Sequence, residues 1–190
     1  MPEITPIKIV AISGSLRAAS SNTCVLRALA AVAPENVEIN INDGIDVLPF
    51  FSPERDTEEA HPAVATLRRS LNEADAVIIC TPEYAFGVPG VLKNALDWTV
   101  SSGNFSKKPL ALISASPLAT GADKAHAALM LTFKALDAIV TDETKLIIPF
   151  IYKKINADAL IIDEATRAQL FFLLQSLIKI AIEEKQKPLE

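Results

Sequence analysis

The sequence predicts an α/β fold in which helices cover both faces of a parallel sheet, and three observations support this. Short apolar runs of strand length alternate with segments whose apolar residues recur at helical spacing. The apolar runs are nearly uninterrupted, which is typical of strands buried on both faces. The chain has 190 residues, of which 50% are hydrophobic, so it is long enough for one domain with a sizeable core.

The first half of the chain supplies three strands and two helices. The run Ile7–Ser13 contains β-branched residues and is followed by a glycine, so it predicts the first strand. Apolar residues at helical spacing predict helices over Asn22–Val32 and around Val64–Leu71. Val37–Ile41 alternates like a second strand, and Ala76–Cys80 is apolar throughout and predicts the third.

The second half continues the same alternation. We expect helices over Val88–Val100, Ala122–Leu136 and Glu164–Ile182, a fourth strand over Leu110–Ser114, and the start of a fifth over Ala138–Thr141. About five strand–helix units in one domain favour a flavodoxin-like three-layer sandwich, with a five-stranded parallel sheet in the order 2-1-3-4-5. The Rossmann order is the alternative. Residues 1–190 are expected to form this single domain, with 183–190 as a frayed tail.

Composition and charge exclude several classes of protein. The formal net charge of -5 argues against a protein that wraps nucleic acid by charge. Two cysteines, Cys24 and Cys80, and two histidines do not fill a structural zinc site, and a reduced cytoplasmic protein is expected. No signal peptide is evident at the N-terminus, and the apolar stretch Leu170–Ile182 is shorter than the ~20 residues of a membrane span. We expect neither a nucleic-acid nor a membrane partner.

The loop after the first strand has the character of a phosphate-binding loop. In a sheet of the predicted order, ligands lie beyond the carboxyl ends of the strands, so the loops after Ser13, Cys80 and Ser114 are where chemistry is expected. The first of them reads SGSLRAASSN, and the helix that follows points its free N–H groups at it. Its candidate phosphate ligands are Ser15, Arg17, Ser20, Ser21 and Asn22. An ordinary serine-capped helix with a solvated arginine remains the alternative.

The loop after the third strand suits a flat ligand. It reads TPEYAFGVPGVLKNALDW, and its prolines and glycines make a stiff turn that presents backbone N–H groups without an ordering cost. Tyr84 and Phe86 supply aromatic surface beside it. For Glu83 we favour a hydrogen bond to nearby backbone over a catalytic role. His126 is expected on the surface, Arg68 on a solvated helix face, and Cys80 buried and unreactive.

These two loops together resemble the NADPH-dependent FMN reductase family, which includes quinone, azo-dye and chromate reductases. The resemblance rests on GSLRAASSN (14–22) and PEYAFGVPGVLKNALDW (82–98) and extends over nearly the whole chain. It implies a flavodoxin-like fold, noncovalently bound FMN, and a homodimer or homotetramer. It also implies that Ser15, Arg17, Ser20 and Asn22 hold the FMN phosphate, that Pro82, Glu83, Tyr84 and Ala85 lie along the isoalloxazine edge, and that Ser116 approaches the ring from the other side.

The implied function is that of an NAD(P)H-dependent quinone reductase, with ping-pong hydride transfer through FMN to a flat electron-poor acceptor. No catalytic side chain is expected, and backbone donors near Ala85 and Phe86 are expected to stabilise charge on the reduced ring. Two departures matter: Ala85 replaces the family's usual asparagine, and the loop from Ser116 to Gly121 has one glycine. These departures leave a non-catalytic relative that has lost FMN as one alternative, and a flavodoxin-type electron carrier is the other.

Overall fold

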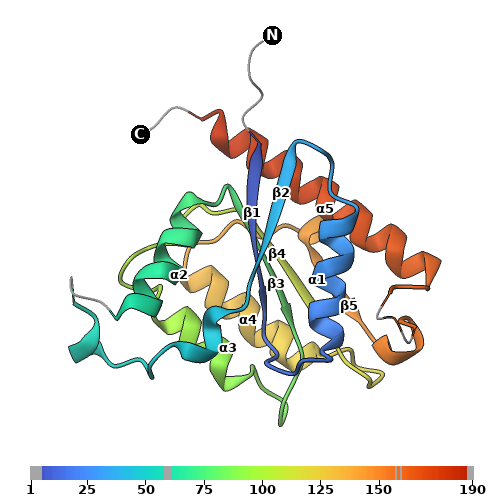
Figure 1. Cartoon of the computed structure of the whole chain (residues 1–190), viewed down its shortest axis with the longest axis horizontal. Coiled ribbons are helices and arrows are strands. Elements are labelled where there is room, and N and C mark those ends of the chain that lie inside the picture. The colour runs from blue at the N-terminus through green and yellow to red at the C-terminus, as the bar shows by residue number, and fades with distance from the viewer. Residues whose placement is uncertain (1–5, 58–60, 157, 159, 188–190) are drawn as a thin grey trace.

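The computed structural model describes residues 6–57, 61–156, 158 and 160–187. Its centre is a parallel sheet with the order β2-β1-β3-β4-β5 (Figure 1), which confirms the predicted flavodoxin-like arrangement. The strands are β1 (Ile7–Ser13), β2 (Val37–Asn42), β3 (Ala76–Thr81), β4 (Leu110–Ala115) and β5 (Lys145–Ile148). The principal helices are α1 (Ser21–Ala31), α2 (Pro62–Glu73), α3 (Gly90–Asp97), α4 (Asp123–Ala135) and α5 (Glu164–Lys185).

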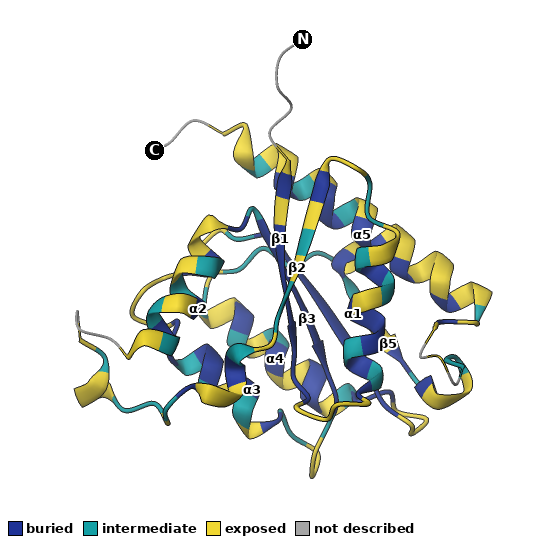
Figure 2. Ribbon diagram, in the orientation of Figure 1, coloured by how far each residue is buried: buried dark blue, intermediate teal, exposed yellow. Residues whose placement is uncertain are grey.

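Two apolar clusters, one on each face of the sheet, hold the layers together. Helices α1 and α5 cover one face, and α2, α3 and α4 cover the other (Figure 1). Every residue of β3 and of β4 is buried, so the central strands form the dark middle layer in Figure 2. Successive residues of these strands pack into opposite clusters, as the alternation of side chains along a strand requires.

The position predicted for the fifth strand was wrong. Within Ala138–Thr141, Ile139 forms an isolated bridge with Pro109, while β5 begins later, at Lys145, and pairs with β4. The intervening turn is closed by the Thr141 N–H, which donates to the Thr144 Oγ1 at 3.0 Å, and by the Thr144 N–H, which donates to the Thr141 carbonyl at 3.3 Å. Both segments are short and apolar, so their local patterns are alike, and pairing with β4 decides which becomes the strand.

Two element boundaries also differ from expectation. Helix α3 begins at Gly90, after Pro89, and ends at Asp97, so it is shorter than the helix expected over 88–100. Helix α5 continues through Lys185, so the first residues of the tail expected to fray over 183–190 are helical. Residues 188–190 lie outside the described part of the chain.

Helix α5 is long and apolar enough, by length and composition, to cross a membrane. One side of it is nevertheless packed on the sheet: Leu173, Leu174 and Leu177 belong to the same cluster as β1, β3 and β4. Asp163 caps its N-terminus, accepting a hydrogen bond from the Thr166 N–H at 2.9 Å. We interpret α5 as a helix of the hydrophobic core.

Candidate functional site

The loops after β1, β3 and β4 all leave the sheet at the carboxyl ends of its strands, which lie at the bottom of Figure 1. The parallel register pairs Ser13 with Cys80 and Thr81 with Ser114, so these strands end at nearly the same level. The Ser15 Oγ and the Tyr84 hydroxyl are 3.5 Å apart, which brings the first two loops into contact. The two motifs identified in the sequence therefore lie side by side, at the switch point where α/β sheets bind ligands.

The first loop leaves several donors available to an anion. Gly14 is required, because a Cβ there would lie 2.5 Å from the Thr81 Oγ1. Ser20 caps α1 by accepting the Thr23 N–H at 3.4 Å, whereas the N–H groups of Ser21 and Asn22 have no acceptor within the described residues. These N–H groups lie at a helix N-terminus, which favours negative charge.

Arg17 adds a cation to this loop. Its side chain is exposed and forms no ion pair with any described residue. Its N–H donates to the Ser15 Oγ at 3.4 Å, and the Ser15 N–H donates to the Ser13 Oγ at 3.3 Å. The hydroxyls therefore shape the loop, while the guanidinium remains available for a phosphate.

Asn22 serves two purposes. Its side chain is buried, donating to the Ala115 carbonyl at 3.4 Å and accepting from the Cys80 Sγ at 3.3 Å. It therefore fixes α1 to the ends of β3 and β4, and only its backbone N–H is left for a ligand. Burial raises the pKa of the Cys80 thiol, so this cysteine stays protonated, and the prediction that it is buried is confirmed.

The second loop is a tight hairpin with a strained tip. The Tyr84 N–H donates to the Gly87 carbonyl at 3.1 Å, and the Gly87 N–H donates to the Tyr84 carbonyl at 3.0 Å. Between them Ala85 and Phe86 have φ of 49° and 59°, the left-handed region that side chains disfavour. Their N–H groups find no acceptor within the described residues. The exposed tip therefore offers two backbone donors, beside the buried Pro82.

Glu83 joins the second loop to α4. Its Oε2 accepts the N–H of Lys124 at 2.8 Å and that of Ala125 at 2.9 Å. A hydrogen bond to backbone was the role we favoured for it, but the backbone is that of α4 and not of its own loop. The carboxylate caps the helix N-terminus, where negative charge is stabilised.

The third loop is tied to the strand beside it. Ser116 is buried, its Oγ accepts the Leu118 N–H at 3.1 Å, and its own N–H donates to the Ile148 carbonyl at 3.2 Å. Gly121 has φ of 63°, and a Cβ there would lie 2.5 Å from the Ile147 Cγ2, so this single glycine is required. The Ser116 hydroxyl hydrogen remains available to a ligand.

The expectation that His126 lies on the surface was wrong. It is 7% exposed, and its Nδ1 lies 3.2 Å from the Ser114 Oγ at the end of β4. Burial, together with the charge of Lys145, lowers its pKa to about 4. Leu129 and Phe133 follow it at helical spacing and are also buried. This spacing puts the three residues on one side of α4, but it does not by itself say that this side meets the sheet.

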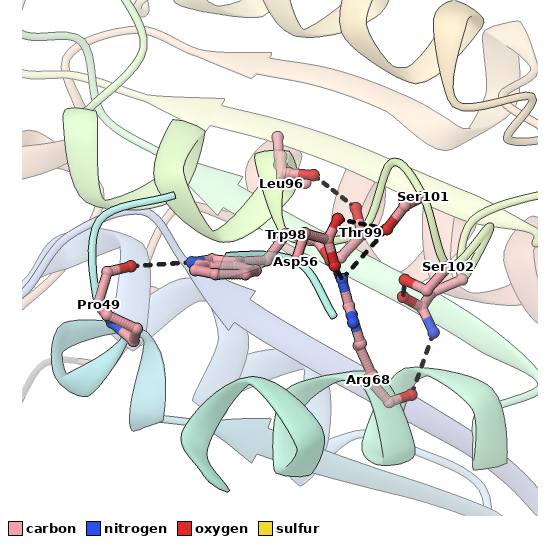
Figure 3. Close-up of polar contacts among 9 residues, drawn as sticks. Pro49, Asp56, Arg68, Leu96, Trp98, Thr99, Ser101 and Ser102 are labelled. Carbon is pink, nitrogen blue, oxygen red and sulfur yellow. Dashed lines mark hydrogen bonds and ion pairs between the residues drawn. The ribbon is translucent and has the colours of Figure 1, made fainter. Parts of the chain in front are cut away.

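Arg68 was also misjudged. Its Nη2 lies 2.7 Å from the Asp56 Oδ1, and its Nε donates to the Trp98 carbonyl at 2.8 Å (Figure 3). The Trp98 indole donates to the Pro49 carbonyl at 2.8 Å and its ring meets Phe51 edge-on. This network anchors the loop after β2 to α2 and α3. A helical wheel does not reveal it, because the partners come from two other segments.

Sequence reasoning also missed two polar residues on the exposed side of α1. The Thr23 Oγ1 donates to the Ser13 Oγ at 3.1 Å, and Arg27 lies one turn further along the helix. Both line a pocket of about 200 Å³ on the β2 side of the first loop. Their spacing of four residues was the available signal.

Comparison with known proteins agrees with this geometry. The model of the NADPH-dependent FMN reductase family matches residues 7–153. The chain belongs to that family. Its match spans all three loops of the site, and the resemblance stated from the two motifs is confirmed.

Relatives with named activities align with most of this chain. It is 32% identical to an NAD(P)H-dependent FMN reductase of Pseudomonas aeruginosa over 173 residues, which covers 90% of this chain and 93% of the relative. It is 33% identical to an NADPH:quinone oxidoreductase of Arabidopsis thaliana, covering 90% of each chain. Among solved structures, FerB, an NAD(P)H:acceptor oxidoreductase from Paracoccus denitrificans, matches with a TM-score of 0.83 and 26% identity, covering 93% of this chain and 98% of FerB.

Proposed function

We propose that this protein is an FMN-dependent NAD(P)H oxidoreductase that reduces quinones or similar flat, electron-poor acceptors. The observation that carries the proposal is the convergence of three loops at the carboxyl ends of β1, β3 and β4, where the first two loops offer backbone N–H groups without an acceptor in the described part of the chain. The named activities of the relatives support the same reaction class. No side chain is assigned as a catalytic residue.

The first loop fits the FMN phosphate. The N–H groups of Ser21 and Asn22 lack acceptors within the described residues, and we assign them, with the Ser15 and Ser20 hydroxyls, to the phosphate oxygens. Arg17 supplies the positive charge. Such a mixture of helix N–H groups, hydroxyls and one guanidinium is suited to a phosphate dianion.

The second and third loops fit the isoalloxazine ring. We assign the N–H groups of Ala85 and Phe86 to the ring edge, and the Ser116 hydroxyl to the opposite side. Pro82 and Tyr84 complete the wall, and Glu83 holds it against α4. Bound FMN supplies the hydride-accepting chemistry. Ala85 has no side-chain amide, so at this position the backbone N–H is the donor.

We further propose that NAD(P)H and the acceptor use the same space in turn, which predicts ping-pong kinetics. The acceptor is a small molecule, and the protein is proposed to act in the cytoplasm as a homodimer or homotetramer. The exposed rings of Phe86 and Tyr84 provide apolar surface beside the site, which suits either a flat acceptor or a second subunit.

The first experiment is the visible absorption spectrum of the purified protein, before and after FMN is added and the sample desalted. We expect a retained flavin spectrum, followed by NAD(P)H oxidation with benzoquinone as acceptor. Flavin retention without NAD(P)H oxidation would favour an electron carrier. No flavin retention would favour the non-catalytic relative.

The phosphate assignment has its own test. Replacing Ser15 and Arg17 together by alanine is expected to weaken FMN binding by about tenfold or more, because a charge-assisted hydrogen bond and a hydroxyl contact are lost. Arg69→Ala, on the exposed side of α2, is the matched control and is expected to bind FMN as the parent does. An unchanged FMN dissociation constant in the double variant would contradict the assignment.

A further inference from the structure

We infer that the pocket on the β2 side of the first loop binds the ADP half of the pyridine nucleotide, and that its charges favour NADH over NADPH. The inference rests on the proposed function, which requires a pyridine nucleotide but leaves its adenosine end unplaced.

The pocket is formed by segments that are far apart in the sequence. The first loop and α1 supply one wall, and the end of β2 with the turn after it supplies the other. Its volume is about 200 Å³, and the lining residues that bear on a ligand are Leu16, Arg17, Arg27, Ile41, Asp43 and Asp46. Arg17 is also assigned to FMN, so a ligand here lies beside the phosphate end of the cofactor.

The charged groups of the pocket are available to a ligand. The side chains of Arg27, Asp43 and Asp46 form no hydrogen bond or ion pair with any residue in the described part of the chain. All three are exposed. They line one pocket, yet the arginine and the aspartates do not pair with one another. Unpaired charges of both signs at one concave site suit a ligand that carries both anionic and hydroxyl groups.

The ADP half of a dinucleotide has the three matching parts. Its diphosphate is an anion, for which Arg27 is the cation not already assigned to FMN. Its ribose carries adjacent hydroxyls, which donate to carboxylates, and Asp43 directly follows β2, where α/β dinucleotide sites place the acidic residue that binds them. Its adenine is flat and apolar, and Leu16 and Ile41 supply apolar surface in the same pocket.

The same carboxylates determine which nucleotide is preferred. The 2′-phosphate of NADPH would replace a ribose hydroxyl that donates to Asp43 or Asp46 with a dianion that these side chains repel. Arg27 would then have to serve both this phosphate and the diphosphate. We therefore assign the preference to NADH.

The test measures binding directly, by titration calorimetry of ADP, NAD⁺ and NADP⁺ into the FMN-saturated protein. We expect ADP to bind in competition with NAD⁺, and NADP⁺ to bind more weakly than NAD⁺. Arg27→Ala should weaken ADP binding by about fivefold, as expected for one exposed charge contact, without changing the FMN dissociation constant. Arg69→Ala is the matched arginine control and should change neither. Asp43→Asn combined with Asp46→Asn should narrow or reverse the difference between NAD⁺ and NADP⁺.

Several results would overturn the inference. ADP binding that does not compete with NAD⁺ would indicate a separate nucleotide site. An Arg27→Ala variant that binds ADP as tightly as the parent would remove the role of the arginine. An unaltered ratio of the NAD⁺ and NADP⁺ dissociation constants in the double aspartate variant would remove the role of the carboxylates. FMN retention and NADH oxidation are measured separately on the parent protein. If the parent neither retained FMN nor oxidised NADH, the proposed function would be refuted, whereas the nucleotide pocket would still be tested by ADP binding. If the parent protein retains no FMN, ADP is titrated into the apoprotein.

Discussion

The carboxylate of Glu83 joins the second loop to α4 by two hydrogen bonds, and its removal should be measurable in both stability and FMN binding. Its two hydrogen bonds, at 2.8 and 2.9 Å, take backbone N–H groups of the first turn of the helix. Glu83 is half-buried, so each bond is assigned about 1 kcal/mol, the usual value of a helix N-cap. Glu83→Ala should therefore lower the free energy of unfolding by about 2 kcal/mol, or the melting temperature by about 4–8 °C for a chain of this length.

The same variant should weaken FMN binding, because the second loop would have to be ordered on binding. A cost of about 1 kcal/mol corresponds to a dissociation constant raised about fivefold. The assays are thermal and urea unfolding of the apoprotein, and FMN titration followed by quenching of flavin fluorescence. Glu83→Gln, which keeps one acceptor oxygen, should fall between parent and alanine variant in both. A melting temperature lowered by less than about 1 °C would refute the capping role, and lower stability with unchanged FMN affinity would refute the positioning role.

Three further predictions concern stability. Because burial holds the pKa of His126 at about 4 against an ordinary 6.5, the unfolded chain binds its proton first as the pH falls. Unfolding free energy should then decrease from pH 6.5 to 4 by up to about 3 kcal/mol, and urea titrations of His126→Gln should lack that component; an identical pH profile would contradict it. Arg68→Ala should cost about 2 kcal/mol, because Asp56 keeps the Ser101 hydrogen bond but loses its cation, and the Trp98 carbonyl loses its two Arg68 donors. Thermal unfolding indistinguishable from that of the parent would exclude this. Gly14→Ala should cost about 1–3 kcal/mol through its clash with Thr81, and a free energy of unfolding in urea equal to that of the parent would contradict this.

The sequence predicted the layer architecture because the signals it carries are local. Nearly uninterrupted apolar runs identify β1, β3 and β4, and periodicity over a few turns identifies α1 and α5. The strand order was favoured by the number of strand–helix units in one domain of this size. The candidate loops were found for the same reason, since the end of a buried strand followed by a helix start is visible in consecutive residues.

Tertiary structure decided everything that depends on residues distant in the chain. The fifth strand is set at Lys145 and not at Ala138 because pairing with β4 chooses between two short apolar segments. His126 is buried because its face of α4 packs on Ser114, and helical spacing alone does not say which face meets the sheet. Burial and side-chain pairing are properties of the packed chain, so a charge or an imidazole cannot be classified from its neighbours in the sequence.

The functional site divides in the same way. The residue types that suit a phosphate and a flat ring are consecutive in two motifs, and the sequence by itself determined them, with the family they indicate. The hydrogen bonds of Glu83 attach the second loop to α4, and Arg27 and Asp43 line one pocket. Both arrangements join segments that only folding brings together. Short motifs record what a loop can bind, whereas the distances between loops are set by the sheet from which they emerge.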